Sequence, residues 1–508
     1  MKKQQTGFPW FMAFFAMYPV LTLFASNIRE VETDVFHRPL AIALLFAGLA
    51  FGVVSLFIRE RTKAALVTSV FLFVFFTYGH VYEIVRHYGF LRYLGGPHVV
   101  LAALSLAILF FGTRFILQAK NLSNFVQAFT LVGAFLTIYP LVQVGMFYYK
   151  IEPADPRPAQ AAQVTQPAQA PDIYYIILDG YSRQDTLQYL GWDNADFIKG
   201  LEDTGFYVAS CARSNYRGTL LSLTSSLNLN YIYNAIPHNG PADTNLEPIY
   251  HALQYNLVRK TLEEKGYQII SFKTGYEWDE WRDADQFLYP SLEDRTFLYP
   301  AIQPFEYLLL QTTALRPLLQ NGFLAKQRYI EHYNRVNYML EELPKVASQP
   351  GPKFVYAHFL APHAPFIYLP DGTINPDYNY YITEAGIGAD DEYTRLGYLN
   401  NVEYISAQIL PVVRQIIANS KQPPVIVIQG DHGYVSEERK YNNLNAYYFP
   451  GSAKDSLYPQ ITPVNTFRLI FNQYLGGNYD LLPDKSISTD PGRPYRMRVE
   501  QPFPAECP

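Results

Sequence analysis

Residues 173–180 read IYYIILDG: six consecutive apolar residues, mostly β-branched or aromatic, and then an Asp-Gly pair. A short apolar run that ends at a turn-forming pair is typical of a strand buried on both faces of a sheet. Three more runs have this character: 267–272 (YQIISF), 354–360 (FVYAHFL) and 425–429 (VIVIQ). The pattern therefore predicts four strands of a single sheet.

Stretches with helical patterning lie between these runs: Tyr250–Lys265, Ala325–Val346 and Thr394–Ser420. Strands that alternate with helices predict an α/β domain whose mostly parallel sheet is covered by helices on both faces. In such sheets, ligands gather at the carboxyl ends of the strands. Asp179 and Asp431 each follow a strand end, and His363 lies three residues beyond Leu360. We expect these side chains to meet at one edge of the sheet.

The first 150 residues are strongly apolar. Five stretches approach the roughly 20 residues that cross hydrocarbon: Phe8–Ser26, Leu40–Ile58, Ala64–Val81, Val99–Ile116 and Phe125–Tyr148. The third is the weakest, because Thr68 and Ser69 dilute it. Lys2 and Lys3 precede the first, as in a signal peptide, but it lacks a small-residue cleavage site and four more stretches follow. A five-helix transmembrane region is therefore predicted over 1–150.

Basic residues in the short loops predict the orientation. Five of them lie in or next to the second and fourth loops and share one side with the N-terminal lysines: Arg59, Arg61, Lys63, Arg114 and Lys120. By the positive-inside rule this side is cytoplasmic, so everything after Tyr148 is expected outside. Residues 151–171 are rich in Pro, Ala and Gln and predict a semi-extended linker. The catalytic domain is predicted at 172–485, followed by a C-terminal tail at 486–508.

Composition excludes some classes of function. The net charge of −5 and the absence of a clustered basic field argue against a nucleic-acid partner. Cys211 and Cys507 are the only cysteines, so there is no disulfide framework and no cysteine zinc motif. The sequence leaves open whether the two pair, and whether the apolar helices only anchor the chain or also hold a lipid substrate.

Three places carry candidate chemistry. Asp431-His432 follows a strand and offers a carboxylate and an imidazole, a pair that suits zinc or manganese. Asp179 could reach the same metal, although an Asp-Gly pair is also an ordinary turn. Thr219 stands where a helix is expected to begin, so its hydroxyl is either a nucleophile activated by a metal or an N-cap.

Two histidines follow in 356–366, YAHFLAPHAPF. His363 lies beside prolines in the loop after the strand, a poor place for a core histidine, and is interpreted as functional. His358 lies within the strand and is interpreted as a core or edge histidine.

Together these pieces resemble the alkaline phosphatase superfamily, in its sulfatase-like branch of polytopic membrane enzymes. That branch includes lipoteichoic acid synthases, phosphoglycerol transferases and phosphoethanolamine transferases. The resemblance rests on four motifs and covers nearly the whole chain: LDG at 178–180, SNYxxTxxSLxSxLN at 214–228, PHxPF at 362–366 and GDHG at 430–433. Residues 464–472 are similar to a helix often found near the family's C-terminus.

The resemblance implies a site with one divalent metal, manganese or zinc with magnesium as an alternative. Its expected ligands are Asp179, Thr219, Asp431 and His432, with Thr219 also the nucleophile. His363 is expected to bind the phosphate of the substrate or to protonate the leaving group. Asn215 and Arg217, in the same motif as Thr219, are expected to contact the substrate.

Three departures from the family pattern restrict which subfamily, how many metal ions and which activity are expected. Lipoteichoic acid synthases and phosphoethanolamine transferases tend to have Glu where this chain has Asp179, so neither subfamily is assigned. No histidine follows His432, so a complete second metal site is not expected. The C/S-x-P-x-R motif of formylglycine sulfatases is missing around Cys211, which disfavours sulfatase activity of that kind.

The expected function is therefore that of a multi-pass enzyme in the cytoplasmic membrane of a bacterium, with its catalytic domain outside. It would move a phosphorylated headgroup from a membrane phospholipid to a glycan or lipid through a covalent Thr219 intermediate. One alternative is a phosphodiesterase or phosphatase that uses water and shares the first half-reaction. The other is an inactive membrane scaffold.

Overall fold

The computed structural model describes residues 10–28, 31, 35–86, 88, 94–150, 170–290, 302, 304–320, 323–377, 392–434, 439–490 and 492–500. The chain forms two compact units. The first comprises Met1–Glu152 with Arg295–Ala325, and the second comprises Pro153–Asp294 with Lys326–Pro508. Most of the predicted linker, and Cys507, lie outside the described residues.

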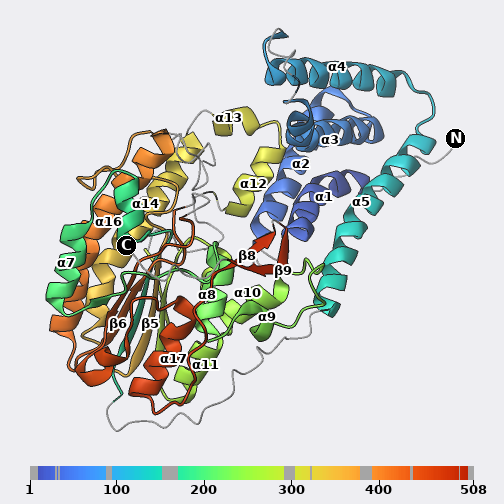
Figure 1. Cartoon of the computed structure of the whole chain (residues 1–508). Helices are drawn as coiled ribbons and strands as arrows, with labels where there is room; N and C mark the ends of the chain where they lie inside the picture. Colours follow the sequence, from blue (N-terminus) through green and yellow to red (C-terminus); the bar gives the residue numbers. More distant parts are fainter. Residues whose placement is uncertain are drawn as a thin grey trace. The chain divides into compact units, whose positions relative to one another are not determined.

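Five apolar helices open the first unit: α1 (Phe11–Ser26), α2 (His37–Phe57), α3 (Arg61–Val85), α4 (Pro97–Gln118) and α5 (Ser123–Lys150) (Figure 1). Within the described residues, α2 to α5 are long and apolar enough to cross a membrane. The 16-residue α1 is shorter: at 1.5 Å per residue it extends roughly 24 Å, less than the ~30 Å of a hydrocarbon core. The structure thus supports four of the five predicted spans by length, and α1 is a shorter apolar helix.

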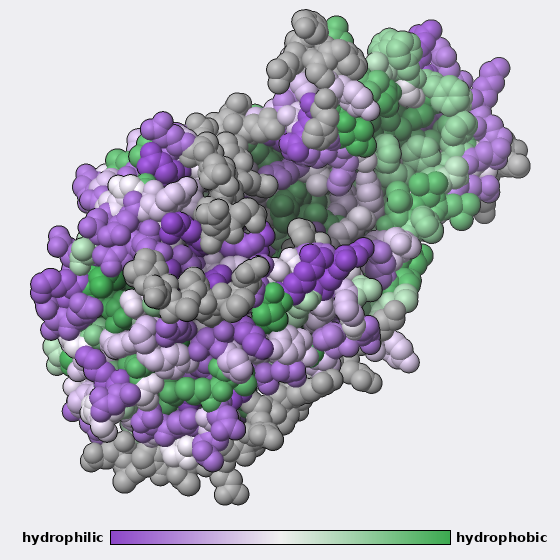
Figure 2. Space-filling view, viewed as in Figure 1, coloured by the Kyte–Doolittle hydropathy of each residue, from purple (hydrophilic) through white to green (hydrophobic). Residues whose placement is uncertain are grey.

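Much of the surface of this unit is apolar (Figure 2). Large apolar side chains on α2, α4 and α5 are exposed, among them Leu49, Phe111 and Phe135. In contrast, 56% of the apolar window of α3 is buried. The hydroxyls of Thr68 and Ser69 donate to the carbonyls of Ala64 and Ala65, each at 2.9 Å, inside the unit. The polar residues that weaken the third stretch therefore lie on the most buried of the four long apolar helices, α2 to α5, and are satisfied there.

Two further helices, α12 (Pro304–Thr312) and α13 (Arg316–Gln320), belong to the first unit although their sequence lies within 172–485. The N–H of Ala314 donates to the carbonyl of Phe75 on α3 at 2.8 Å. A Cβ at Gly79 would overlap the backbone of Gln311 and Thr312. Only glycine at position 79 lets α12 lie this close to α3.

The second unit contains a seven-stranded sheet with the order β2-β7-β6-β1-β5-β3-β4. Its strands are β1 (Ile173–Leu178), β2 (Tyr207–Val208), β3 (Gln268–Phe272), β4 (Gln286–Leu288), β5 (Lys353–Phe359), β6 (Val425–Gln429) and β7 (Asn445–Tyr448). The five strands from β6 to β4 are parallel, whereas β7 and β2 are antiparallel to their neighbours. The prediction of a mostly parallel sheet is confirmed.

Side chains of β1 alternate between two cores. Tyr174 and Ile176 pack on the face covered by α7 (Ala195–Thr204), α14 (Phe323–Val346) and α16 (Glu392–Asn419). Tyr175 and Ile177 pack on the other face, against α8 (Thr219–Leu227), α11 (Leu257–Glu264) and α17 (Pro463–Tyr474). Helices cover both faces, as predicted, so the ends of the parallel strands are left to form a site.

Short elements complete the second unit: α6 (Gln184–Tyr189), α9 (Ile232–Ala235), α10 (Glu247–Gln254), η2 (Glu277–Asp279) and η4 (Gly451–Ser456). The hairpin of β8 (Ile487–Asp490) and β9 (Arg493–Val499) lies in the stretch predicted as a tail. Cys211 is disulfide-bonded.

Candidate functional site

The site begins where β1 ends. The N–H of Asp179 donates to the carbonyl of Phe359 at 3.0 Å, and its own carbonyl accepts from the N–H of His363 at 3.0 Å. These bonds hold the end of β1 beside the loop that follows β5. Gly180 has a φ of 71°, a left-handed conformation that turns the chain away from the sheet. The Asp179 carboxylate is fully buried, and within the described part of the chain neither of its oxygens has a hydrogen-bond partner.

Asp431 and His432 follow the neighbouring strand, β6. The Asp431 Oδ1 accepts from the N–H of Gly180 at 2.8 Å. The Nδ1 of His432 lies 3.0 Å from the carbonyl of Gly433, so a neutral ring carries its proton there. The other nitrogen, Nε2, lies 3.5 Å from Asp179 Oδ1 and 3.5 Å from Asp431 Oδ2. Two carboxylates and one imidazole thus converge on one point.

Thr219 is the first residue of α8, and its side chain is close enough to Asp431 to help lower the pKa of that carboxyl. Gly218 is the N-cap residue, so the interpretation of Thr219 as an N-cap does not hold. The neighbouring hydroxyl of Ser222 donates to the backbone carbonyl of Asp431 at 2.6 Å and is buried. Ser222 therefore bonds the backbone of Asp431, whereas Thr219 acts on the pKa of its carboxyl.

His363 completes the group from the loop after β5. Its Nδ1 lies 2.7 Å from the carbonyl of Ala364, and its ring meets the edge of His432 with centroids 6.2 Å apart. Ligand atoms of Asp179, His363 and His432 all lie within 4.8 Å of one another. His432 is buried and His363 is partly exposed, which leaves His363 on the accessible side of the cluster.

Sequence reasoning missed the part played by His358. The core interpretation accounts for only one of its ring nitrogens: Nδ1 lies 2.5 Å from Asp279 Oδ2. The other, Nε2, is 3.6 Å from Asp179 Oδ2 and has no hydrogen-bond partner among the described residues. Asp179, His358 and Asp431 form a second group of potential ligands, with ligand atoms within 4.8 Å. His358 therefore faces the site.

Asp279, from η2, is the partner that orients His358. Its other oxygen accepts from the Tyr356 hydroxyl at 2.5 Å, and all three side chains are buried. Tyr356 and His358 are two residues apart on β5, and this spacing puts them on one face of the strand. This spacing could have indicated from the sequence that Tyr356 and His358 share a partner. Nothing in the sequence indicated that Asp279 is that partner, because it comes from a separate segment.

Charge inside the cluster is unbalanced toward carboxylates. Burial and the facing carboxylate of Asp431 raise the pKa of Asp179 to about 8, although His358 and His432 oppose the rise. Burial would also raise the pKa of Asp431, but His432, His358 and the Gly180 N–H outweigh it and lower that pKa. Burial would lower the pKa of His358, but Asp279 and then Asp179 and Asp431 outweigh it and raise that pKa to about 9.

These observations fit a divalent cation. Buried carboxylate oxygens without hydrogen-bond partners are costly unless a cation or a donor faces them. Asp179 and Asp431 supply oxygen ligands, His432 supplies nitrogen, and Thr219 adds a hydroxyl. Mixed oxygen and imidazole sets of this kind suit zinc or manganese.

For the other two residues expected to contact the substrate, Asn215 and Arg217, that role stays a prediction. Asn215 is buried; its Oδ1 accepts from the N–H of Val464 at 2.8 Å and its Nδ2 donates to the carbonyl of Lys485 at 2.9 Å. Asn215 therefore ties the segment before Thr219 to the start of α17. Arg217 is exposed on the surface.

Comparison with known proteins gives a family match. Residues 170–470 match the model of the family described as Sulfatase. No curated protein sequence matches the chain significantly. Among solved structures, the C-terminal periplasmic domain of EptC from Escherichia coli has a TM-score of 0.40 and 11% identity, covering 68% of this chain and 97% of that one.

Two other solved structures are similar at the same level. The integral membrane lipooligosaccharide phosphoethanolamine transferase A from Neisseria meningitidis has a TM-score of 0.38 and 11% identity, covering 90% of this chain and 94% of that one. A protein of the alkaline phosphatase superfamily from Vibrio parahaemolyticus has a TM-score of 0.38 and 10% identity, covering 66% of this chain and 76% of that one.

Proposed function

This chain belongs to the sulfatase family, and we propose that it is a membrane-bound, metal-dependent transferase of that family. It moves a phosphorylated headgroup from a phospholipid to an extracytoplasmic glycan or lipid. The observation that carries the proposal is the position of Thr219: it begins α8 beside Asp431, whose pKa it helps to lower, and Asp431 belongs to the buried cluster of Asp179 and His432.

The metal, when bound by Asp179, Thr219, Asp431 and His432, supplies positive charge that stabilises the developing charge on phosphorus oxygens. Thr219 Oγ attacks phosphorus, the bond to the lipid alcohol breaks, and the headgroup stays on Thr219 as a phosphodiester. The hydroxyl of an acceptor then attacks the same phosphorus. The bond to Thr219 Oγ breaks, and the threonine regains its proton.

His363 is suited to carry the proton between these groups. Burial lowers its pKa, so its ring is neutral near pH 7 and can accept a proton from an attacking hydroxyl. The imidazolium formed in this way is more acidic than an ordinary imidazolium, which favours return of the proton to the departing alcohol. Its partly exposed position beside His432 supports this role.

Two features support a phospholipid as donor and a location outside the cytoplasm. Four helices long enough to cross a membrane belong to the same chain as the cluster, which would tether the catalytic unit to a membrane. Cys211 is disulfide-bonded, and disulfides persist in oxidising compartments rather than in a reducing cytoplasm.

A covalent-adduct experiment tests the proposal. The full chain, purified in detergent with manganese or zinc, is mixed with a bacterial lipid extract, stopped in acid and digested. We expect a phosphodiester on the peptide that contains Thr219, and the mass of this adduct identifies the headgroup. Adding a glycan or lipid acceptor should discharge it. Discharge by water alone, at the same rate with and without acceptors, would make the chain a phosphodiesterase, and failure to form any adduct with any phospholipid would overturn the proposal.

A further inference from the structure

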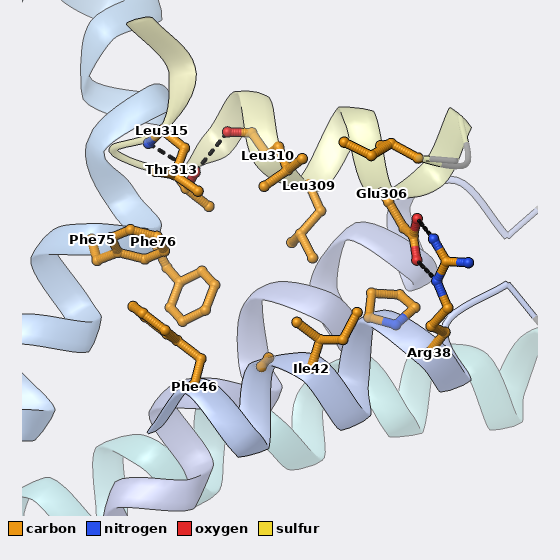
Figure 3. Close-up of a pocket in the computed structure, with 13 residues that line it drawn as sticks. Arg38, Ile42, Phe46, Phe75, Phe76, Glu306, Leu309, Leu310, Thr313 and Leu315 are labelled. Carbon is orange, nitrogen blue, oxygen red and sulfur yellow. Dashed lines mark hydrogen bonds and ion pairs between the residues drawn. The ribbon is translucent and has the colours of Figure 1, made fainter. Parts of the chain in front are cut away.

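The first unit contains an apolar pocket of about 310 Å³, remote in the sequence from the motifs of the cluster (Figure 3). Its walls come from α2, α3 and α12, and include Ile42, Phe46, Phe76 and Leu309. Phe46 and Phe76 meet edge to face, with ring centroids 6.4 Å apart. In Figure 3, Ile42 and Leu309 point toward one another across the pocket. A pocket of this volume is within the range of small-molecule sites, roughly 300–1,000 Å³.

Among the described residues that line the pocket, charge is confined to one end. Arg38 and Glu306 form a two-fold ion pair there, with both N···O distances 2.6 Å. The other lining residues that the structure describes are apolar except Thr313, whose hydroxyl is used within its own turn. It donates to the carbonyl of Leu310 at 2.7 Å and accepts from the N–H of Leu315 at 3.1 Å. The wall therefore suits a ligand with charge at one end and hydrocarbon beyond it.

The pocket opens on a surface that is itself apolar. Ile42 is 52% exposed and Leu315 is 37% exposed, so the lining continues into the surface of the unit. In a bilayer, the medium that meets such a surface is lipid acyl chain, not water. The α2 residues of the pocket lie at the beginning of that helix and the α3 residues lie toward its end. Consecutive spanning helices place those two ends on the same side of the membrane.

We propose that this pocket binds one acyl chain of an outer-leaflet phospholipid, with the phospholipid headgroup beside the Arg38–Glu306 pair. The choice of leaflet rests on the proposed function, because the orientation given there puts the start of α2 and the end of α3 outside. The charged end then lies at headgroup level and the apolar walls lie at acyl level. The membrane unit is thus a binding site for the lipid class on which the enzyme acts, and not only an anchor.

Photolabelling tests this site without turnover. The full chain carrying Thr219→Ala is placed in bilayer nanodiscs of phosphatidylethanolamine and phosphatidylglycerol that contain a phosphatidylethanolamine with a diazirine in one acyl chain. After irradiation, labelled peptides are identified by mass spectrometry. We expect label on both the peptide of α12 and the peptide of α2 that lines the pocket.

A matched pair of substitutions makes the test specific. Ala43 is buried and lines the pocket, so Ala43→Phe fills it; Ala41, two residues earlier, is exposed, so Ala41→Phe adds the same bulk outside. Excluding each methylene from an apolar site weakens binding roughly fourfold. Labelling of α12 should therefore fall more than about tenfold in Ala43→Phe once two methylenes are excluded, and stay unchanged in Ala41→Phe.

A second pair covers the case in which Ala43→Phe does not fold. Leu315→Trp adds bulk at the exposed mouth, and Leu318→Trp adds it at an exposed position of α13 outside the lining. If α12 is labelled equally in both members of each pair that folds, the proposal that this pocket binds an acyl chain is wrong. If the wild-type protein turns over phospholipid but the pocket is not labelled, the pocket proposal fails and the proposed function stands. If the pocket is labelled but no adduct forms on Thr219 of the wild-type protein, the proposed function fails and the lipid-binding pocket stands.

Discussion

His358 and Asp279 form a buried 2.5 Å hydrogen bond that aims the other nitrogen of the imidazole at Asp179. A histidine whose far nitrogen is held by a carboxylate has a fixed tautomer and ring orientation. The pair therefore couples η2 to the cluster, although neither residue belongs to the four expected metal ligands.

Asp279→Asn should weaken metal binding by roughly 10–100-fold, the usual cost of losing a partner that orients a residue of a metal site. Asp283→Asn is the control, because Asp283 lies four residues on, is half-exposed and pairs with Arg259 instead. Metal affinity of both variants can be measured by competition with a fluorescent chelator. Equal affinity in the two variants would show that Asp279 only supports the fold.

The site should bind one divalent metal per chain. Asp179→Asn and His432→Ala should each lose it, because both remove a ligand from a site that is otherwise buried and acidic. Elemental analysis of the full chain after gel filtration gives the count. Two equivalents, both lost in His432→Ala, would contradict the single site, and His358 would then be the residue to test next.

Metal-free protein should lose stability as the pH rises from about 6.5 to about 9. The folded pKa of Asp179, about 8, lies above its ordinary 3.8, and that of His358, about 9, lies above its ordinary 6.5. In this window the folded state binds more protons than the unfolded state, so its stability falls as protons are lost. Metal replaces those protons and should abolish or reverse the trend. Thermal unfolding of chelated and metal-loaded protein across the window measures both slopes; a chelated protein that becomes more stable toward pH 9 would contradict the charges assigned here.

Thr219→Ala should keep the fold but lose activity by several orders of magnitude, as expected when a covalent nucleophile is removed. The helix is little affected, because Gly218 is the cap and alanine is a good helix former. Ser222→Ala is the matched control, one turn along the same helix. It removes the 2.6 Å hydrogen bond to the Asp431 carbonyl but should keep the adduct chemistry. If Ser222→Ala were dead and Thr219→Ala active, the nucleophile would be misassigned.

A reporter that is active only in the cytoplasm should be silent when fused after Asp172. The prediction follows from the placement of lysine and arginine in the short loops. It also bears on α1, since an α1 that does not cross would move the N-terminus to the other side. A second fusion at the N-terminus separates these cases: it should be active if α1 crosses and silent if it does not.

The strands and their order of appearance could be predicted because buried parallel strands have strong local signals. β1 and β6 begin and end where the apolar runs do, and the convergence of Asp179 with Asp431 followed from the topology. The short strands β2, β4 and β7 could not be predicted, because two to four residues carry no periodicity. They form only because the edges of the sheet offer partners.

The parts of the site that escaped the sequence are all relationships between distant segments. His358 looks like an ordinary strand residue until Asp279 and Asp179 are placed on either side of it. Asn215 bonds Val464 and Lys485, two partners that its own motif does not indicate. The local sequence pattern predicts which residues lie in or just after a strand. It does not predict which residues from distant segments contact them.

The assignment of α12 and α13 to the helical unit has a practical consequence for handling the molecule. The chain passes between the two units after Glu152, again after Asp294 and again after Ala325. Cleavage in the linker at 151–171 cuts only one of these three connections, so it should not release a free catalytic fragment. A recombinant fragment that starts at Asp172 likewise contains α12 and α13 but lacks α3, against which α12 packs. Soluble expression should therefore call for excision of 295–325 and its replacement by a short polar loop.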